Sequence, residues 1–113
     1  MNEKRRQALR ARLEARAAEL AEAERSSADD RRPVELDQQS VGRLSRMDAM
    51  QVQAMSNAQS RRRATEMRRI AAALKRFDAG EYGYCAECGE EIAEKRLDLD
   101  PATPLCIDCA SGR

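Results

Sequence analysis

Apolar residues recur at helical spacing in two long and otherwise polar stretches of the chain. The first stretch, residues 3–25, is dominated by the strong helix formers Ala, Leu, Arg and Glu and contains no Gly or Pro. Its apolar residues form one narrow stripe: Leu9, Leu13, Ala17 and Leu20. Such a stripe is too narrow for a globular core but suits one seam of a helix pair. The pattern therefore predicts a helix over about residues 3–25 that packs against another helix.

The second stretch, residues 41–77, contains no proline, and its only glycine is Gly42. An apolar side marks its first half at Val41, Leu44, Met47 and Met55. A cleaner stripe with 3-4-3 spacing follows at Met67, Ile70, Leu74 and Phe77. A helix over this stretch would be a rod of roughly 55 Å at 1.5 Å per residue. We interpret its methionines as adaptable packing residues of the helix pair.

The segment between the two stretches, residues 26–40, is rich in Ser and Asp and includes Pro33, which favours a loop. The pattern thus predicts an antiparallel hairpin over residues 1–77 with its tip at about residues 26–40. Gly80 ends the second helix, so a different module begins there and occupies residues 78–113. The predicted fold class is mainly α, a long antiparallel helical hairpin (coiled coil) followed by a small module.

Composition narrows the function classes. The chain has 113 residues, of which 36% are charged and 3% aromatic, and it contains no His. These figures argue against a thick globular core and remove the commonest general base. No apolar run is long enough to span a membrane, and residues 1–16 lack the apolar stretch of a signal peptide. We expect a cytoplasmic, monomeric protein that is not an enzyme.

Charge is unevenly distributed although the formal net charge is only +1. Residues 41–77 carry nine basic and two acidic side chains, a local charge of +7. Residues 78–113 carry three basic and nine acidic side chains, a local charge of −6. This segregation predicts an electrostatically polar molecule. The basic stretch is equally consistent with the solvated face of a long helix.

All four cysteines lie in the last module, as Cys85-Ala-Glu-Cys88 and Cys106-Ile-Asp-Cys109 with seventeen residues between the pairs. A two-residue gap lets both thiolates of a pair face one ion, and this double spacing is typical of a tetrahedral zinc site with four cysteine ligands. Gly89 permits a tight turn after Cys88. Since four thiolates leave no open coordination position, the sequence predicts one structural Zn²⁺ in a small zinc finger.

The residues around the cysteines carry further predictions. A small apolar set is expected around the metal, made of Ile92, Leu97, Leu99 and Leu105. Arg96 and Leu97 read as the start of a short strand. Tyr82 and Tyr84 are expected to pack at the junction with the long helix.

Other uses of the cysteines remain open at this point. A dithiol redox centre needs one pair on a βαβ scaffold, two disulfides need an oxidising compartment, and four thiolates also bind iron. Because zinc fingers contact DNA, RNA and proteins alike, the alternative function is a module that binds nucleic acid through Arg61–Arg69, or a thiol redox switch. The acidic finger itself is poorly suited to a phosphate backbone.

Beyond the cysteines, the string GEYGYCAECGEEIAEKRLDLDPATPLCIDCA closely resembles the zinc finger of the DksA/TraR family of bacterial transcription regulators. The matching features are Gly-Tyr-Cys before the first pair, then Cys88 to Ile92, Arg96-Leu97, Pro101, and Leu105 to Cys109. This string covers about a quarter of the chain. The predicted hairpin upstream agrees with the architecture that the family implies.

The resemblance implies a regulator that docks on RNA polymerase and reads no promoter sequence. Family members insert the hairpin into the secondary channel of the polymerase, where acidic residues at the tip come near the catalytic magnesium. The acidic residues of the predicted tip are Asp29, Asp30, Glu35 and Asp37. Carboxylates there are attracted to Mg²⁺ or to Lys and Arg clusters, although loops also collect Asp and Ser for turn formation.

The tip departs from the family pattern, which is Asp-Pro-Val-Asp followed one residue later by Ala. The corresponding stretch here runs from Arg32 to Glu35, and Asp37 replaces the Ala. The second helix is also about ten residues longer than in that pattern, which makes Asp48-Ala49 a competing register. These departures are compatible with a short DksA-like paralogue whose tip acts differently on the polymerase.

Several family members bind the alarmone ppGpp between the protein and the polymerase rim. Counted from Cys85, Arg62 and Arg69 fall at basic contact positions of the family, and their separation of seven residues places them on one helix face. Gln59 and Glu66 alter the other contact positions. The expected partner is therefore RNA polymerase, with ppGpp as a candidate second ligand and without sequence-specific DNA binding.

Overall fold

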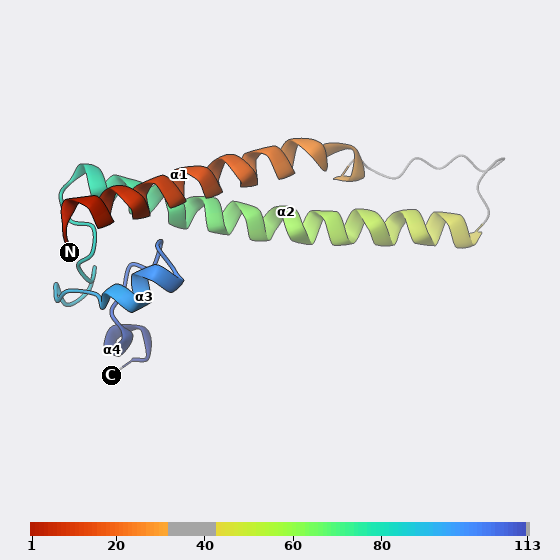
Figure 1. Cartoon of the computed structure of the whole chain (residues 1–113). Coiled ribbons are helices and arrows are strands. Elements are labelled where there is room, and N and C mark those ends of the chain that lie inside the picture. The colour runs from red at the N-terminus through yellow and green to blue at the C-terminus, as the bar shows by residue number, and fades with distance from the viewer. Residues whose placement is uncertain (32–42, 113) are drawn as a thin grey trace. The chain divides into compact units, whose positions relative to one another are not determined.

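The computed structural model describes residues 1–31 and 43–112, which are mainly helical (Figure 1). The long helices are α1 (Glu3–Ser26) and α2 (Arg43–Asp78), and a 3₁₀ helix, η1 (Ala28–Arg31), follows α1. Two short helices, α3 (Glu94–Leu99) and α4 (Ile107–Ala110), belong to the C-terminal module. The predicted fold class, a helical hairpin followed by a small four-cysteine zinc finger, is confirmed.

Strand structure is nearly absent from the described part of the chain, where the only bridge of strand type joins Tyr84 and Glu91. In that same part, no helix combines the length and the apolar character that crossing a membrane requires.

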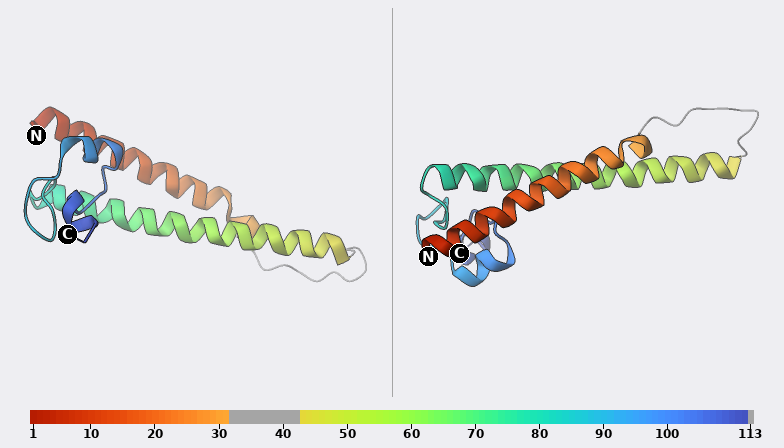
Figure 2. Two further views of the ribbon diagram at one scale, coloured as in Figure 1. Left: turned by 90° about the horizontal axis from the view of Figure 1, so that it is seen from below. Right: turned by 45° about the horizontal axis from the view of Figure 1, so that its top comes forward.

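Internal packing divides the chain into two compact units. The base unit comprises Met1–Ala18 and Glu66–Arg113, so it contains the start of α1, the end of α2 and the finger. The distal unit comprises Glu19–Thr65. Each unit contains an antiparallel pair of segments from α1 and α2, as the two views in Figure 2 show.

In the base unit, the two helices pack through a small apolar seam. Leu9 and Leu13 of α1 and Ile70 of α2 have exposed fractions of 2–3%. Ala73 is fully buried beside them, although the predicted stripe did not include it. Burial of each large aliphatic side chain stabilises this seam by about 1.5–3 kcal/mol.

The end of α2 shows how the chain turns into the finger. The amide of Glu81 donates to the carbonyl of Arg76 at 2.8 Å, and the amide of Gly80 donates to that of Phe77 at 3.1 Å. These two bonds form a Schellman motif, which requires the φ of +74° that Gly80 adopts. Just beyond, the ring of Tyr82 stacks on Phe77 with centroids 3.8 Å apart. The helix end is thus fixed by both backbone and aromatic contacts.

Of the two tyrosines predicted at this junction, only Tyr82 is buried. Its exposed fraction is 2%, and its hydroxyl donates to the carbonyl of Pro101 at 2.8 Å. Burial raises the pKa of Tyr82 to about 12. Tyr84 is instead 40% exposed.

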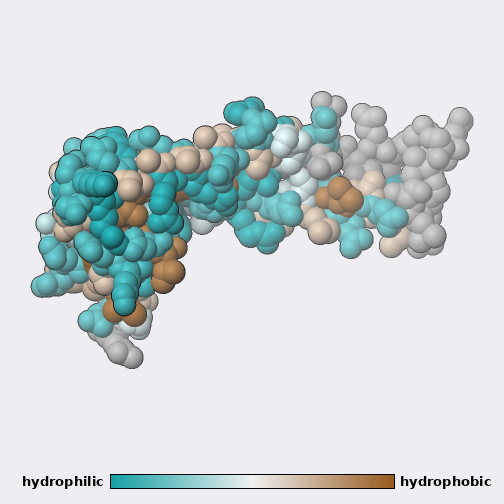
Figure 3. Space-filling model, viewed as in Figure 1, coloured by the Kyte–Doolittle hydropathy of each residue, from teal (hydrophilic) through white to brown (hydrophobic). Residues whose placement is uncertain are grey.

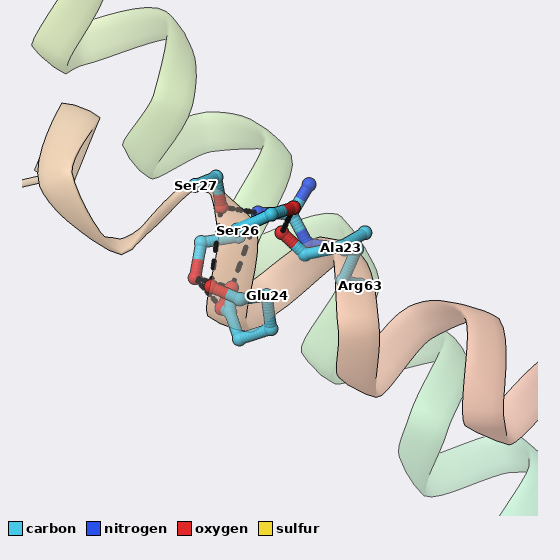
Figure 4. Close-up of polar contacts among 6 residues, drawn as sticks. Ala23, Glu24, Ser26, Ser27 and Arg63 are labelled. Carbon is cyan, nitrogen blue, oxygen red and sulfur yellow. Dashed lines mark hydrogen bonds and ion pairs between the residues drawn. The ribbon is translucent and has the colours of Figure 1, made fainter.

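The distal unit is held mainly by polar contacts (Figure 4). Glu24, near the end of α1, accepts hydrogen bonds from Ser60 at 2.6 and 2.8 Å and from Arg63 at 3.1 Å, both on α2. Arg63 also donates to the hydroxyl of Ser27 at 2.8 Å. We call these four residues the polar clamp. Next to it, Leu20 is buried at 3% exposure and continues the predicted stripe of α1.

The first half of α2 differs from its prediction. Met47 and Met55, predicted on an apolar side, are 57% and 59% exposed. The reason is length: the distal unit contains only the last eight residues of α1, from Glu19 to Ser26, which pair with α2 near Ser60. Hydrophobic surface is accordingly visible on this part of α2 in Figure 3.

Candidate metal centre

The four cysteine Sγ atoms converge on one point of the finger. All four lie within 4.8 Å of one another, and the Sγ atoms of Cys88 and Cys106 are 3.7 Å apart. A tetrahedral ion with Zn–S bonds of about 2.3 Å would space its sulfurs about 3.8 Å apart. The thiols form no disulfide. Donor set and spacing therefore fit one structural Zn²⁺.

A tight backbone loop positions the first cysteine pair. The amide of Cys85 donates to the carbonyl of Glu90 at 2.8 Å, and the amide of Gly89 donates to that of Cys85 at 3.0 Å. Gly89 has a φ of +77°, a backbone conformation that residues with a side chain rarely adopt. The turn predicted after Cys88 is therefore confirmed, and it explains why glycine occupies that position.

The second cysteine pair lies at the start of α4. Cys106 is the N-cap residue of this helix, and the amide of Ala110 donates to its carbonyl at 2.9 Å. The amide of Ala86 donates to the carbonyl of Pro104 at 2.8 Å, which joins the first cysteine loop to the chain that enters the second pair. Backbone hydrogen bonds, more than a large core, thus place the sulfurs.

The electrostatic surroundings of the sulfurs favour a bound cation. Backbone N–H groups, first that of Cys88 and then that of Cys106, lower the pKa of Cys85 to about 6, because a donor stabilises a thiolate. Hydrogen bonds with neighbouring thiols, Cys106 first, raise the pKa of Cys109. Crowded thiolates repel each other, and a divalent cation relieves that repulsion while it binds all four. This chemistry agrees with the spacing of the sulfurs.

The apolar residues near the metal centre follow the prediction only in part. Ile92 and Leu97 are buried, with exposed fractions of 4% and 1%, whereas Leu99 is 88% exposed. The strand predicted to begin at Arg96 is wrong, since Arg96 lies in α3. This helix has the sequence Glu-Lys-Arg-Leu-Asp-Leu, in which good helix formers predominate. Helix propensity therefore prevailed over the predicted strand.

Ion pairs tie the finger to the long helices within the base unit. Arg69 on α2 donates to the carboxylate of Asp100 at 2.6 Å. Arg12 on α1 donates to the backbone carbonyl of Asp98 at 3.0 Å, and Arg5 forms an ion pair with the carboxylate of the same residue. These partners are 31 to 93 residues apart in the sequence. The spacing of residues along the sequence therefore could not predict these contacts.

The predicted tip residues are only partly described. Asp29 and Asp30 lie in η1, and the side chain of Asp29 is exposed. Glu35 and Asp37 lie outside the described residues, together with Arg32. Asp48, the competing register, is exposed on α2. The role of the tip carboxylates therefore stays a prediction.

The two arginines predicted as alarmone contacts have different surroundings. Arg62 is exposed on α2, whereas Arg69 is engaged by Asp100 at 2.6 Å. Of the altered contact positions, Gln59 is exposed, and Glu66 accepts two hydrogen bonds from Arg16 at 2.6 and 3.0 Å. This bidentate contact lowers the pKa of Glu66.

Comparison with known proteins also identifies residues 80–113 as a zinc finger with four cysteine ligands. Residues 80–113 match the family described as prokaryotic dksA/traR C4-type zinc finger. Over 43 residues, 38% of this chain, the chain is 51% identical to the RNA polymerase-binding transcription factor DksA of Haemophilus influenzae and 42% identical to that of Escherichia coli K12. The matched residues amount to 30% and 28% of those relatives, so the sequence likeness covers less than a third of their length.

A solved structure extends the likeness beyond the finger. The structure of transcription factor DksA2 from Pseudomonas aeruginosa matches with a TM-score of 0.77 at 27% sequence identity. The match covers 98% of this chain and 84% of the other. The hairpin and the finger therefore occur together in a known transcription factor.

Proposed function

Because this chain is a zinc-finger protein of the DksA/TraR family, we propose that it regulates transcription by binding bacterial RNA polymerase. The observation that carries this proposal is the structural match to DksA2 over 98% of the chain, since it covers the hairpin as well as the finger. The identity of 51% between the finger and that of an RNA polymerase-binding factor supports it.

The finger binds one structural Zn²⁺ through Cys85, Cys88, Cys106 and Cys109. The ion supplies no chemistry to a reaction, since four sulfur ligands leave no open position for a substrate. Its role is to fix the base of the hairpin, because its four ligands join the loop of the first pair to the start of α4. The protein acts as a regulator and not as an enzyme, and it is a cytoplasmic monomer.

In the finer version of the proposal, residues 1–77 form a hairpin that enters the secondary channel of the polymerase, and residues 78–113 form the finger outside it. The tip carboxylates of Asp29, Asp30, Glu35 and Asp37 approach the catalytic magnesium. The antiparallel packing of α1 and α2 in each unit supports a hairpin. The exposed carboxylate of Asp29, in the 3₁₀ helix η1 that follows α1, supports an acidic tip.

Binding of ppGpp would use Arg62 and Arg69, because arginine forks suit phosphate oxygens. Arg62 is exposed, but Arg69 first has to release Asp100. An alarmone phosphate therefore competes with the carboxylate of Asp100, and Asp100→Asn should strengthen ppGpp binding to the complex with polymerase. Promoter DNA is read by the polymerase and not by this chain.

In vitro transcription with purified polymerase tests the proposal. The chain should change transcript yield from promoters with short-lived open complexes. Substitution of the four tip carboxylates by Asn or Gln should abolish that change and leave polymerase affinity within about threefold. The reason is that the tip carboxylates act inside the channel, whereas the contacts that dock the protein lie elsewhere. A chain that leaves transcription unchanged at every promoter would refute the proposal. A large loss of affinity in the tip variant would make the tip an anchor.

A further inference from the structure

A groove with a volume of about 750 Å³ lies on the finger beside the metal centre. It opens onto the metal centre, since Cys88, Cys106 and Cys109 line it together with other residues of α3, of α4 and of the first cysteine loop, all within the base unit. Leu99 and Ile107 line it with exposed fractions of 88% and 68%, the highest of any large hydrophobic residue in the described part of the chain. Hydrophobic atoms are visible on the surface of the finger in Figure 3. The apolar lining is therefore open to a partner.

Two large aliphatic side chains in one groove are more informative than scattered ones. Isolated exposed hydrophobic residues are normal on protein surfaces, but adjoining ones rimmed by charge mark interaction sites. Leu99 is the last residue of α3 and Ile107 the first of α4, so helices on both sides of the groove contribute one residue each. The packing of the finger does not account for their exposure, since the large aliphatic residues that it buries are Ile92 and Leu97.

Seven of the nine carboxylates of residues 78–113 fall into two sets, and the other two, Glu81 and Glu87, are exposed and belong to neither. The first set is neutralised by basic groups of α1 and α2 or by the N-terminus: Asp78, Glu94, Asp98 and Asp100. The second set lines the groove and has no ion pair among the described residues: Glu90, Glu91 and Asp108. Lys95 and Arg96 also line it, and Arg96 is engaged by the carbonyl of Leu105 at 2.9 Å. Carboxylates outnumber cations on the rim by three to two.

We propose that this groove docks a segment of RNA polymerase that carries an aliphatic side chain flanked by Lys or Arg. The aliphatic side chain covers Leu99 and Ile107, and its basic neighbours face Glu90, Glu91 and Asp108. The partner is basic because the three rim carboxylates have no ion pair among the described residues and outnumber the two cations on the rim, of which Arg96 is already engaged. This inference rests on the proposed function and adds to it the surface of the finger that makes the contact.

The apolar half of the inference is tested with Leu99→Ser and with Ile107→Thr. Burial of a leucine side chain is worth roughly tenfold to a hundredfold in affinity, so Leu99→Ser should raise the Kd for purified core polymerase by about that factor in biolayer interferometry. The matched control is Tyr84→Ser, which removes an exposed large side chain of the finger outside this groove. Zinc content and the thermal midpoint are measured for each variant, and both should equal those of the unmodified chain.

The electrostatic half is tested with Glu90→Lys combined with Asp108→Lys. Reversal of rim charges should slow association and raise the Kd several-fold at low salt, and the difference should shrink as salt is added. Glu81→Lys combined with Glu87→Lys is the control, because both are exposed carboxylates that do not line the groove and the change in net charge is the same. Equal effects of the two charge reversals would show that net charge, and not the groove, matters.

The outcomes separate this inference from the proposed function. If the unmodified chain fails to bind polymerase, both are refuted. If it binds and Leu99→Ser binds equally well, the groove is refuted and the proposed function stands. If Leu99→Ser abolishes self-association in sedimentation and leaves polymerase affinity unchanged, the groove joins two copies of this chain and the inference is overturned.

Discussion

The base unit and the distal unit contain segments of the same two helices but are stabilised differently. In the base unit, α1 and α2 bury Leu9, Leu13, Ile70 and Ala73, and the finger packs around a metal centre. In the described part of the distal unit, only one aliphatic side chain is buried, that of Leu20. There, the polar clamp joins the two helices. Apolar packing and metal binding therefore stabilise the base, while a few hydrogen bonds hold the distal segments together.

Removal of the metal should have the largest effect, and it should be confined to the base unit. Structural zinc contributes on the order of 10 kcal/mol to the folding of small fingers. Cys88→Ser should abolish tight zinc binding, measured as metal content per chain, and should broaden the amide resonances of residues 78–112. Ala86→Ser, a change in the same loop at a position that is not a ligand, should bind one zinc. A folded finger in metal-free Cys88→Ser would contradict this view.

Truncation of the core of the finger should come next. Leu97 is 1% exposed, so Leu97→Ala should lower the free energy of unfolding of the base unit by about 2–5 kcal/mol. Leu99→Ala is the paired control two residues later on the same helix, and at 88% exposure it should change stability by less than about 0.5 kcal/mol. Chemical denaturation of the zinc-loaded chain measures both. Equal losses would mean that the finger is not packed as described.

The polar clamp should control the distal unit alone. Arg63→Met leaves Glu24 and Ser27 without one donor each, which should weaken the distal unit by about 1–2 kcal/mol. Hydrogen exchange should become faster at amides of the distal unit while those of the finger keep their protection. Glu22→Gln breaks the exposed pair between Glu22 and Arg25 and serves as the control, with an expected change below about 0.5 kcal/mol. Uniform loss of protection would show that the two units unfold together.

The smallest effect is expected from pH at Glu66. Hydrogen bonds from Arg16 lower its pKa below the ordinary 4.5, so the carboxylate stabilises the folded state at neutral pH. That contribution, about 0.5 kcal/mol because both side chains are partly exposed, should be lost as the pH falls below 4.5 and through the lowered pKa. The stability difference between the unmodified chain and Glu66→Gln should therefore vanish in acid. A difference that persists at low pH would contradict the assignment.

The features that sequence alone could predict are those with a local code. Helical spacing revealed Leu9, Leu13, Leu20 and Ile70, and all four are buried. Cysteine spacing revealed the metal centre, because each pair lies in one local element, the first in a tight loop and the second at the start of α4. The division of the chain at residue 77 stays a prediction, as do the roles of the tip residues.

Other features depend on contacts between distant residues and could not be predicted. Arg69 was read as an alarmone contact, but which carboxylate it meets depends on how the finger packs on α2. Arg63 belongs to the basic stretch that the sequence predicts to be a solvated face or a nucleic-acid contact, yet its side chain is only 15% exposed because it enters the polar clamp. Met47 and Met55 were read as packing residues because spacing does not tell how far the partner helix extends.

Binding of the zinc-loaded chain to purified bacterial RNA polymerase tests the central claim most directly. Sedimentation velocity after nuclease treatment should show a saturable complex of one chain per polymerase. The Cys88→Ser variant, whose finger lacks its metal, should form that complex only weakly. If the unmodified chain sediments separately from the polymerase, or if the complex disappears with the nuclease, the chain does not act on polymerase and the account is wrong.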